Sequence, residues 1–142
     1  MVQRYRQRIS GPLLDRIDLH VDVPSVEYKE LTTGAAGESS EVIRSRVERC
    51  RQIQSERFRK DAGVSTNSGM TPRLIKKHCE LDAEGGQFLE HHMGEMNFSA
   101  RAHDRILKVA RTLADLGGQE KISADNVMEA VQYRTLDRKL WV

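Results

Sequence analysis

The chain has 142 residues, of which 38% are hydrophobic and 31% charged, a composition typical of one small globular domain with a solvated surface. Its formal net charge of +2 does not by itself indicate nucleic acid or an anionic membrane as a partner. No apolar run approaches the roughly 20 residues of a membrane-spanning helix, and residues 1–8 lead into no apolar signal-peptide core, so we expect a cytoplasmic protein without membrane contact.

Residues 17–23 have the pattern of a β-strand. In Ile-Asp-Leu-His-Val-Asp-Val, apolar and polar residues alternate strictly, and Pro24 ends the pattern. No other segment gives a comparable strand signal, and a single strand is not stable without a partner. We therefore predict one orphan strand, whose sheet lies outside this sequence, within an extended or disordered N-terminal segment.

The remainder of the chain predicts helices. A small-residue linker ends at Ser39 or Ser40, either of which can cap a helix from about Glu41 to Lys60. The apolar stripe expected along this helix consists of Ile43, Val47, Cys50 and Ile53. Four more helix starts follow, at Thr71-Pro72, Asp82, Ser99 and Ser123. We predict an all-α fold, with a short N-terminal unit (1–24), a flexible linker (25–40) and a small helical bundle (41–142).

Asp15 and Arg16 lie on the loop that enters the predicted strand, just after a turn at Gly11-Pro12. A charged pair at the end of a strand can act outward on a partner. A surface salt bridge is the simpler alternative, and it would contribute little to stability. The residues alone leave both interpretations open.

A basic cluster lies on the helix predicted after Ser99. Arg101, Arg105 and Lys108 share one face of that helix by their i, i+4, i+7 spacing. Arg101 lies in the first turn, where a cation opposes the helix dipole, and this small cost hints at another role for it. The alternative is a solvated basic face opposite the apolar stripe.

Other candidate sites are weaker. Cys50 and Cys79 are expected to be two buried thiols, and the histidine pair His91-His92 lies in neither a CxxC nor an HExxH pattern, so we expect no metal site. Residues 41–61 carry seven basic and four acidic side chains. The cations are Arg44, Arg46, Arg49, Arg51, Arg57, Arg59 and Lys60. Because they are spread around the helix, they favour a solvated face over nucleic-acid contact.

The stretch ISGPLLDRIDLHVDVP, residues 9–24, closely resembles the end of the AAA+ core in magnesium-chelatase-like ATPases, the group often called YifB or ComM. The resemblance implies that Arg16 is an arginine finger reaching the nucleotide of a neighbouring protomer and that Asp15 supports that interface. A planar, permanently charged guanidinium stabilises charge on a transferring phosphoryl group. Residues 1–24 would then be a remnant of the AAA+ core, ending in its last strand.

Ser99-Ala100-Arg101 resembles the sensor-2 motif of the same family, whose arginine contacts the γ-phosphate. Arg101 is the matching residue, and Arg105 fits less specifically. Residues 122–134 resemble the closing helix of such lid domains. The resemblance covers nearly the whole chain and implies that the helical bundle is an AAA+ lid domain.

The chain contains no Gly-x-x-x-x-Gly-Lys-Ser/Thr loop and no apolar strand ending in Asp-Glu. The resemblance places both upstream. ATP and Mg²⁺ are therefore expected cofactors of the intact protein, whereas this chain alone should bind neither tightly and should not hydrolyse ATP. The expected partners are the neighbouring protomers of a homo-hexameric ring.

The resemblance implies different substrates for different members of the family. For ComM-type members it implies DNA branch migration in natural transformation, and for chelatase members it implies metal insertion into porphyrin. The form ISGPLLDRIDLH favours the first group, with DNA as a candidate partner. The alternative from another class is a stand-alone helical nucleic-acid-binding module, which would bind DNA in a salt-dependent way.

Overall fold

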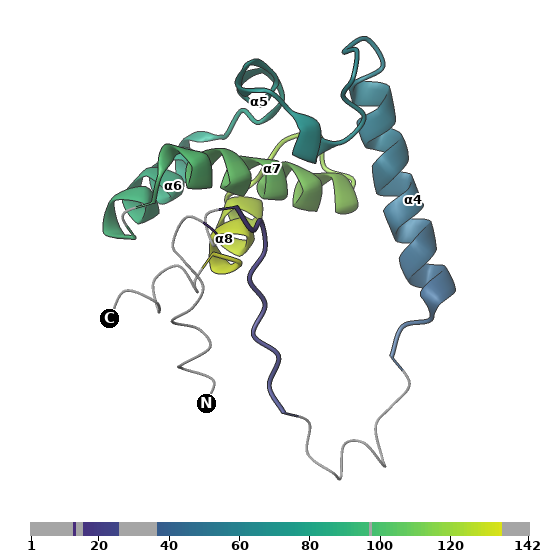
Figure 1. The fold of residues 1–142 in the computed structure, drawn as a ribbon, viewed down its shortest axis with the longest axis horizontal. Coiled ribbons are helices and arrows are strands. Elements are labelled where there is room, and N and C mark those ends of the chain that lie inside the picture. The colour runs from purple at the N-terminus through teal and green to yellow at the C-terminus, as the bar shows by residue number, and fades with distance from the viewer. Residues whose placement is uncertain (1–12, 14–15, 26–36, 97, 135–142) are drawn as a thin grey trace.

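The computed structural model describes residues 13, 16–25, 37–96 and 98–134, and these contain five α-helices and one short 3-10 helix (Figure 1). The helices are α4 (Ser40–Arg57), η1 (Asn67–Gly69), α5 (Pro72–His78), α6 (Ala83–Glu95), α7 (Ala100–Leu116) and α8 (Ala124–Gln132). The predicted all-α bundle is confirmed. None of the helices in the described part is long and apolar enough to cross a membrane.

The helices begin where the sequence places their capping residues. The capping side chains that accept a backbone N–H bond are Ser39, Asp82, Ser99 and Ser123. At Thr71 the proline that follows starts the helix without a side-chain cap. Each cap satisfies an N–H group that has no partner inside the helix, so these local signals were sufficient to predict the helix starts.

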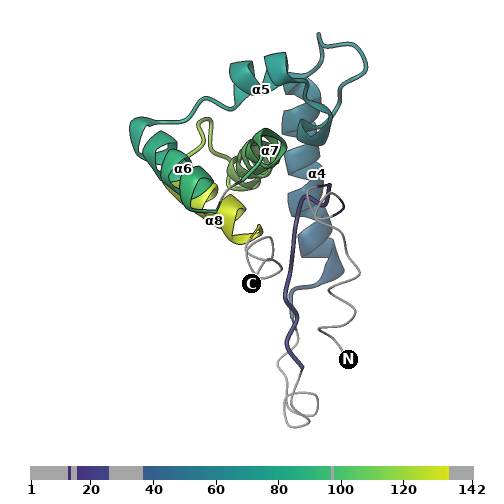
Figure 2. The same ribbon diagram turned by 60° about the vertical axis from the view of Figure 1, so that its left-hand side comes forward.

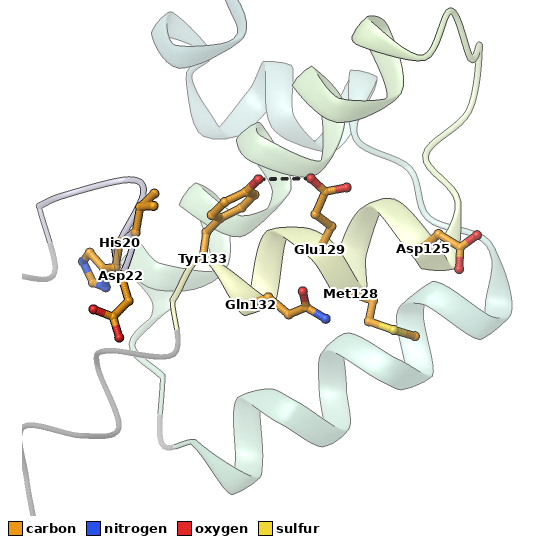
Figure 3. Close-up of a pocket in the computed structure, with 8 residues that line it drawn as sticks. His20, Asp22, Asp125, Met128, Glu129, Gln132 and Tyr133 are labelled. Atoms are coloured by element: carbon orange, nitrogen blue, oxygen red, sulfur yellow. Dashed lines mark hydrogen bonds between the residues drawn. The ribbon is translucent and has the colours of Figure 1, made fainter. Parts of the chain in front are cut away.

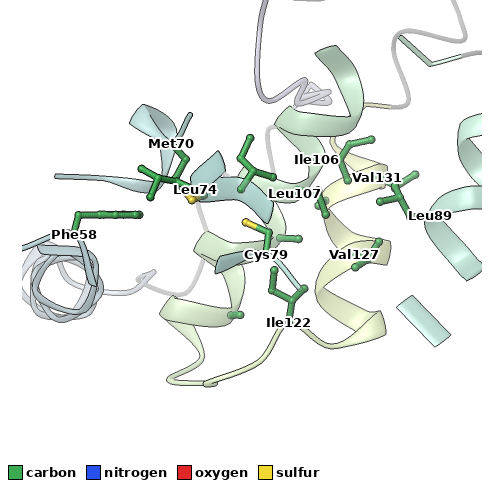
Figure 4. Close-up of a cluster of buried hydrophobic side chains, with 14 residues drawn as sticks. Phe58, Met70, Leu74, Cys79, Leu89, Ile106, Leu107, Ile122, Val127 and Val131 are labelled. Atoms are coloured by element: carbon green, nitrogen blue, oxygen red, sulfur yellow. The ribbon is translucent and has the colours of Figure 1, made fainter. Parts of the chain in front are cut away.

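Helix α7 is the centre of the bundle. It packs against α8 on one side and α4 on the other, while α6 lies against α8 (Figure 2). Ala102, Ala110 and Ala114 of α7 are at most 1% exposed, and their small side chains allow close packing. Larger apolar side chains from α5 to α8 and from the loops, including Phe58 just after α4, complete the core (Figure 4). Among them are Phe58, Leu74, Leu89, Ile106, Ile122 and Val127.

Helix α4 packs on the bundle only through its C-terminal half (Figure 1). Residues 40–49 are exposed, including Ile43 at 42% and Val47 at 44%. We expected Ile43, Val47 and Cys50 to form one buried apolar stripe, and only Cys50 is buried. The prediction was wrong for the N-terminal half of the helix because no described part of the chain covers it.

Residues 16–25 run as an irregular segment with no strand assigned among them. One backbone bond joins this segment to the end of α8, with 2.8 Å between the amide nitrogen of His20 and the carbonyl oxygen of Tyr133. In this segment the polar His20 is buried, at 8% exposed, whereas the apolar Val21 and Val23 are 64% and 79% exposed. This is the opposite of what the alternating pattern predicts. No sheet within the described residues covers the apolar side chains of this segment.

A buried network of charged groups fixes α4 against α7. The Asp115 carboxylate, whose side chain is fully buried, accepts bonds from Arg57 at 2.6 Å, from Asn67 at 2.8 Å and from the Nε of Arg111 at 3.1 Å. Arg111 also donates to the carbonyl oxygens of Gln119 and Glu120. We expected Arg57 to lie on a solvated face of α4, but its ion pair with Asp115 half-buries it.

His78 makes the stability of the bundle dependent on pH. Its ring packs edge-on against Phe58, with 5.6 Å between ring centroids. Burial lowers the pKa of His78 below the ordinary 6.5, and the nearby charge of Lys77 lowers the pKa further. The unfolded chain therefore takes up the proton more readily than the folded chain, so stability falls as the pH drops below about 6.5.

We expect the free energy of unfolding to fall more in the wild type than in His78→Leu when the pH is lowered from about 7.5 to about 5. The physical reason is that leucine cannot take up the proton that the unfolded wild-type chain gains at this position. Urea unfolding of both proteins at the two pH values measures the difference. Equal losses would show that His78 does not contribute to the pH dependence.

Candidate functional site

The predicted basic face of α7 is present in the structure. The hydroxyl of Ser99 caps the helix by accepting a bond from the amide of Ala102 at 3.1 Å, and the buried alanines fix which side of α7 faces the core. Arg101 is exposed at the first turn, and Arg105 and Lys108 are half-buried further along the same side. All three cations line one pocket.

This pocket, called here the α7 pocket, has a volume of about 540 Å³, within the usual range for small-molecule sites. Its lining combines the basic face with an apolar patch from the second half of α7. The described lining residues are Asp18, Leu19, Ser68, Arg101, Asp104, Arg105, Lys108, Val109, Thr112, Leu113, Leu116 and Tyr133. Three cations and two carboxylates leave the lining with a positive balance, which suits an anionic ligand.

The three cations differ in how they are held. The Nζ of Lys108 donates to the carbonyl oxygen of Ser68 at 2.9 Å. The guanidinium of Arg105 forms an ion pair with Asp18 of the N-terminal segment. Arg101 forms no hydrogen bond or ion pair with another described residue, so its guanidinium is free to bind an anion that enters the pocket.

Arg16 lies apart from the α7 pocket and is exposed. Its amide donates to the carbonyl oxygen of Leu13 at 3.0 Å. The structure therefore does not bring Arg16 and Arg101 into one pocket. Asp15, the predicted support for Arg16, lies outside the described residues.

A second pocket of about 550 Å³ lies between the N-terminal segment and α8 (Figure 3). Its lining carries the carboxylates Asp22, Asp125 and Glu129 and no lysine or arginine. The hydroxyl of Tyr133 donates to Glu129 at 3.1 Å, and this bond raises the pKa of the tyrosine. Three carboxylates would repel a phosphate, so the α7 pocket is the better candidate for an anionic ligand.

The histidines and cysteines form no site in the described part of the chain. No group of three or more His, Cys, Asp or Glu side chains there could hold a metal ion. Both cysteines are buried and unpaired with each other, as predicted. Burial raises the pKa of Cys79 to about 11, which keeps the thiol protonated and unreactive at neutral pH.

Sequence reasoning missed Asp18 as a site residue. It was placed on the polar face of a strand, but its carboxylate meets Arg105, 87 residues further along the chain. It also missed the Asp115 network, although the i, i+4 spacing of Arg111 and Asp115 within an apolar stripe was a visible signal. Only the tertiary fold brings Arg57 to that pair.

The comparisons with known proteins agree with this architecture. Residues 37–134 match the family described as magnesium chelatase, subunit ChlI C-terminal, and residues 1–31 match magnesium chelatase, subunit ChlI. The chain belongs to the magnesium chelatase ChlI family. The helical bundle lies within the part that matches the C-terminal family, whereas Asp18 and Leu19 of the α7 pocket lie in the part that matches the other ChlI model.

Two curated relatives of this ChlI-family chain extend the comparison. The competence protein ComM of Haemophilus influenzae is 39% identical over 98% of this chain, and the uncharacterized protein YifB of Escherichia coli is 38% identical over 96%. The matched region is 26% of the length of each relative. The chain therefore spans about a quarter of these proteins.

Proposed function

We propose that this chain is the nucleotide-sensing lid of a magnesium-chelatase-like AAA+ ATPase. The observation that carries the proposal is the exposed Arg101 at the first turn of α7, in a pocket that also contains Arg105 and Lys108. A cation placed against the helix dipole gains little inside this chain. It gains more from an anion held close to it.

The residues of the α7 pocket fit the phosphates of a nucleotide. Arginine binds phosphate through two parallel N–H bonds, and lysine adds a compact charge. ATP supplies the phosphoryl group that the intact enzyme would transfer to water. The groups that would hold Mg²⁺ and cradle the phosphates are placed by this proposal in an upstream core of the intact protein.

The proposal extends to the assembly of the intact protein. Arg16 is exposed on a segment at the edge of the bundle, and from there it would reach the nucleotide of a neighbouring subunit in a homo-hexameric ring. Such head-to-tail contacts close into a ring when each subunit presents one surface to the complementary surface of the next. Arg101 would then read the nucleotide of its own subunit.

Replacing Arg101 by alanine in the intact protein is expected to lower ATP hydrolysis by about 100-fold or more, because a charge-stabilising contact to the phosphates is lost. Steady-state phosphate release at saturating ATP measures the effect. Arg73→Ala is the matched control, since this arginine is 84% exposed and lies on α5 away from the pocket. Equal activity in both variants would remove the basis of the proposal.

We place the action of the intact motor on DNA. The support is the 39% identity with a protein named for competence. The alternative from another class is a stand-alone nucleic-acid-binding module, in which the exposed arginines along α4 would contact the phosphate backbone. That module would bind DNA as this chain alone, with an affinity that falls steeply with salt, whereas the motor lid would bind DNA weakly without the upstream core.

A further inference from the structure

We propose that Asp18 is an internal anion that occupies Arg105 in the absence of ligand and that the phosphates of a bound nucleotide displace it. The inference rests on the function proposed above and adds a regulatory step to the same pocket. The Asp18 carboxylate enters the α7 pocket from the N-terminal segment and pairs with Arg105. It therefore holds the cation that a phosphate oxygen would otherwise contact.

The pair is built so that an incoming anion can exchange with it. The side chain of Asp18 is 50% exposed and that of Arg105 is 24% exposed. An ion pair open to solvent contributes little to stability, so a carboxylate with one negative charge loses Arg105 easily to a polyphosphate with several. Arg101 and Lys108 in the same lining add further attraction for the polyphosphate.

Displacement of Asp18 would loosen the N-terminal segment. Among the other contacts that hold this segment on the bundle are the amide of His20, which donates to the Tyr133 carbonyl, and the side chain of Arg134, which donates to the Ile17 carbonyl. Arg16 lies two residues before Asp18, on the same short stretch of backbone. Within this chain, binding of a polyphosphate would thus loosen the segment that carries Arg16.

Asp104 provides a matched control for Asp18. Its carboxylate also lines the α7 pocket and its side chain is 41% exposed, but it pairs with His103, whereas Arg105 pairs with Asp18. Replacing either aspartate by asparagine removes one negative charge from the pocket and strengthens the binding of any polyanion. Only Asp18→Asn also removes the carboxylate that pairs with Arg105. The difference in affinity between the two variants therefore measures the effect of displacing Asp18 from Arg105.

The test is an amide NMR titration of the 142-residue chain with sodium tripolyphosphate. We expect Asp18→Asn to bind about three- to fivefold more tightly than Asp104→Asn, the range that a solvent-exposed ion pair allows. In the wild type, tripolyphosphate should also accelerate hydrogen exchange at the His20 amide, because the segment comes away from Tyr133. In Asp18→Asn that amide should exchange faster before any tripolyphosphate is added.

Three results would overturn the inference: equal affinities of the two variants, weaker binding by Asp18→Asn than by the wild type, or no binding by any of the proteins. Weaker binding would mean that Asp18 positions Arg105 for the ligand and does not compete with it. The function itself is judged separately by ATP hydrolysis of Arg101→Ala in the intact protein. A loss there combined with equal affinities here would reject the displacement and leave the proposed function standing.

Discussion

Arg16→Ala in the intact protein is expected to reduce ATP hydrolysis by about 1,000-fold or more, the contribution of an arginine finger in related phosphoryl transfers. The guanidinium would lie at the nucleotide of the neighbouring subunit and stabilise charge on its transferring phosphoryl group. Arg16→Lys should recover little of the rate, because an ammonium group cannot reproduce the planar, two-pronged geometry. ATP turnover of the assembled protein, measured with nucleotide binding in parallel, separates loss of chemistry from loss of affinity.

The control for this prediction is again Arg73→Ala, which removes one exposed guanidinium from a different helix. It should leave ATP turnover unchanged and thereby account for any general effect of reduced charge. If Arg16→Ala retains the wild-type rate, Arg16 is not an arginine finger.

Asp115→Ala is expected to destabilise the chain by about 3–5 kcal/mol, the usual cost of removing one partner from a buried ion pair. The substitution leaves Arg111, only 3% exposed, and the half-buried Arg57 without their shared carboxylate. Asn67 loses a bond to the same group. Because this network joins α4 to α7, α4 should be the first element to separate, which urea unfolding and amide exchange of α4 would show.

Asp104→Ala on the same helix is the matched control, since its carboxylate is 41% exposed and lies outside the network. Its effect should stay within about 0.5 kcal/mol, as for other surface substitutions. Asp115→Asn should fall between the two, because it keeps the shape and one acceptor but loses the charge. A cost for Asp115→Ala as small as that of the control would show that the network does not hold α4 in place.

The helical part of the fold was predictable because its signals are local. Ser39, Asp82, Ser99 and Ser123 each combine a capping side chain with an amphipathic or compact run that follows. Burial along α4 and the N-terminal segment was not predictable in the same way. The apolar side chains of Val47 and Val21 are exposed because the surfaces that would cover them are absent from the described residues.

The candidate site was also only partly predictable from the sequence. The shared face of Arg101, Arg105 and Lys108 follows from helical spacing alone, and the structure places all three in one pocket. The contact of Asp18 with Arg105 depends on how the N-terminal segment returns to α7, and no pattern within either segment encodes it. The roles of Arg16 and Arg101 at a nucleotide stay predictions that rest on the family resemblance.

The central proposal is that Arg101 contacts the nucleotide of its own subunit and that Arg16 contacts that of a neighbour. Its most direct test is ATP hydrolysis by mixed rings of Arg16→Ala and Arg101→Ala subunits of the intact protein. If Arg101 serves its own nucleotide and Arg16 that of its neighbour, an Arg16→Ala subunit beside an Arg101→Ala subunit has one complete site. Random mixing in equal parts should then restore about a quarter of the wild-type rate from two inactive proteins, since half of the subunits have the required neighbour half of the time. No recovery on mixing, with ring assembly intact, would contradict the account.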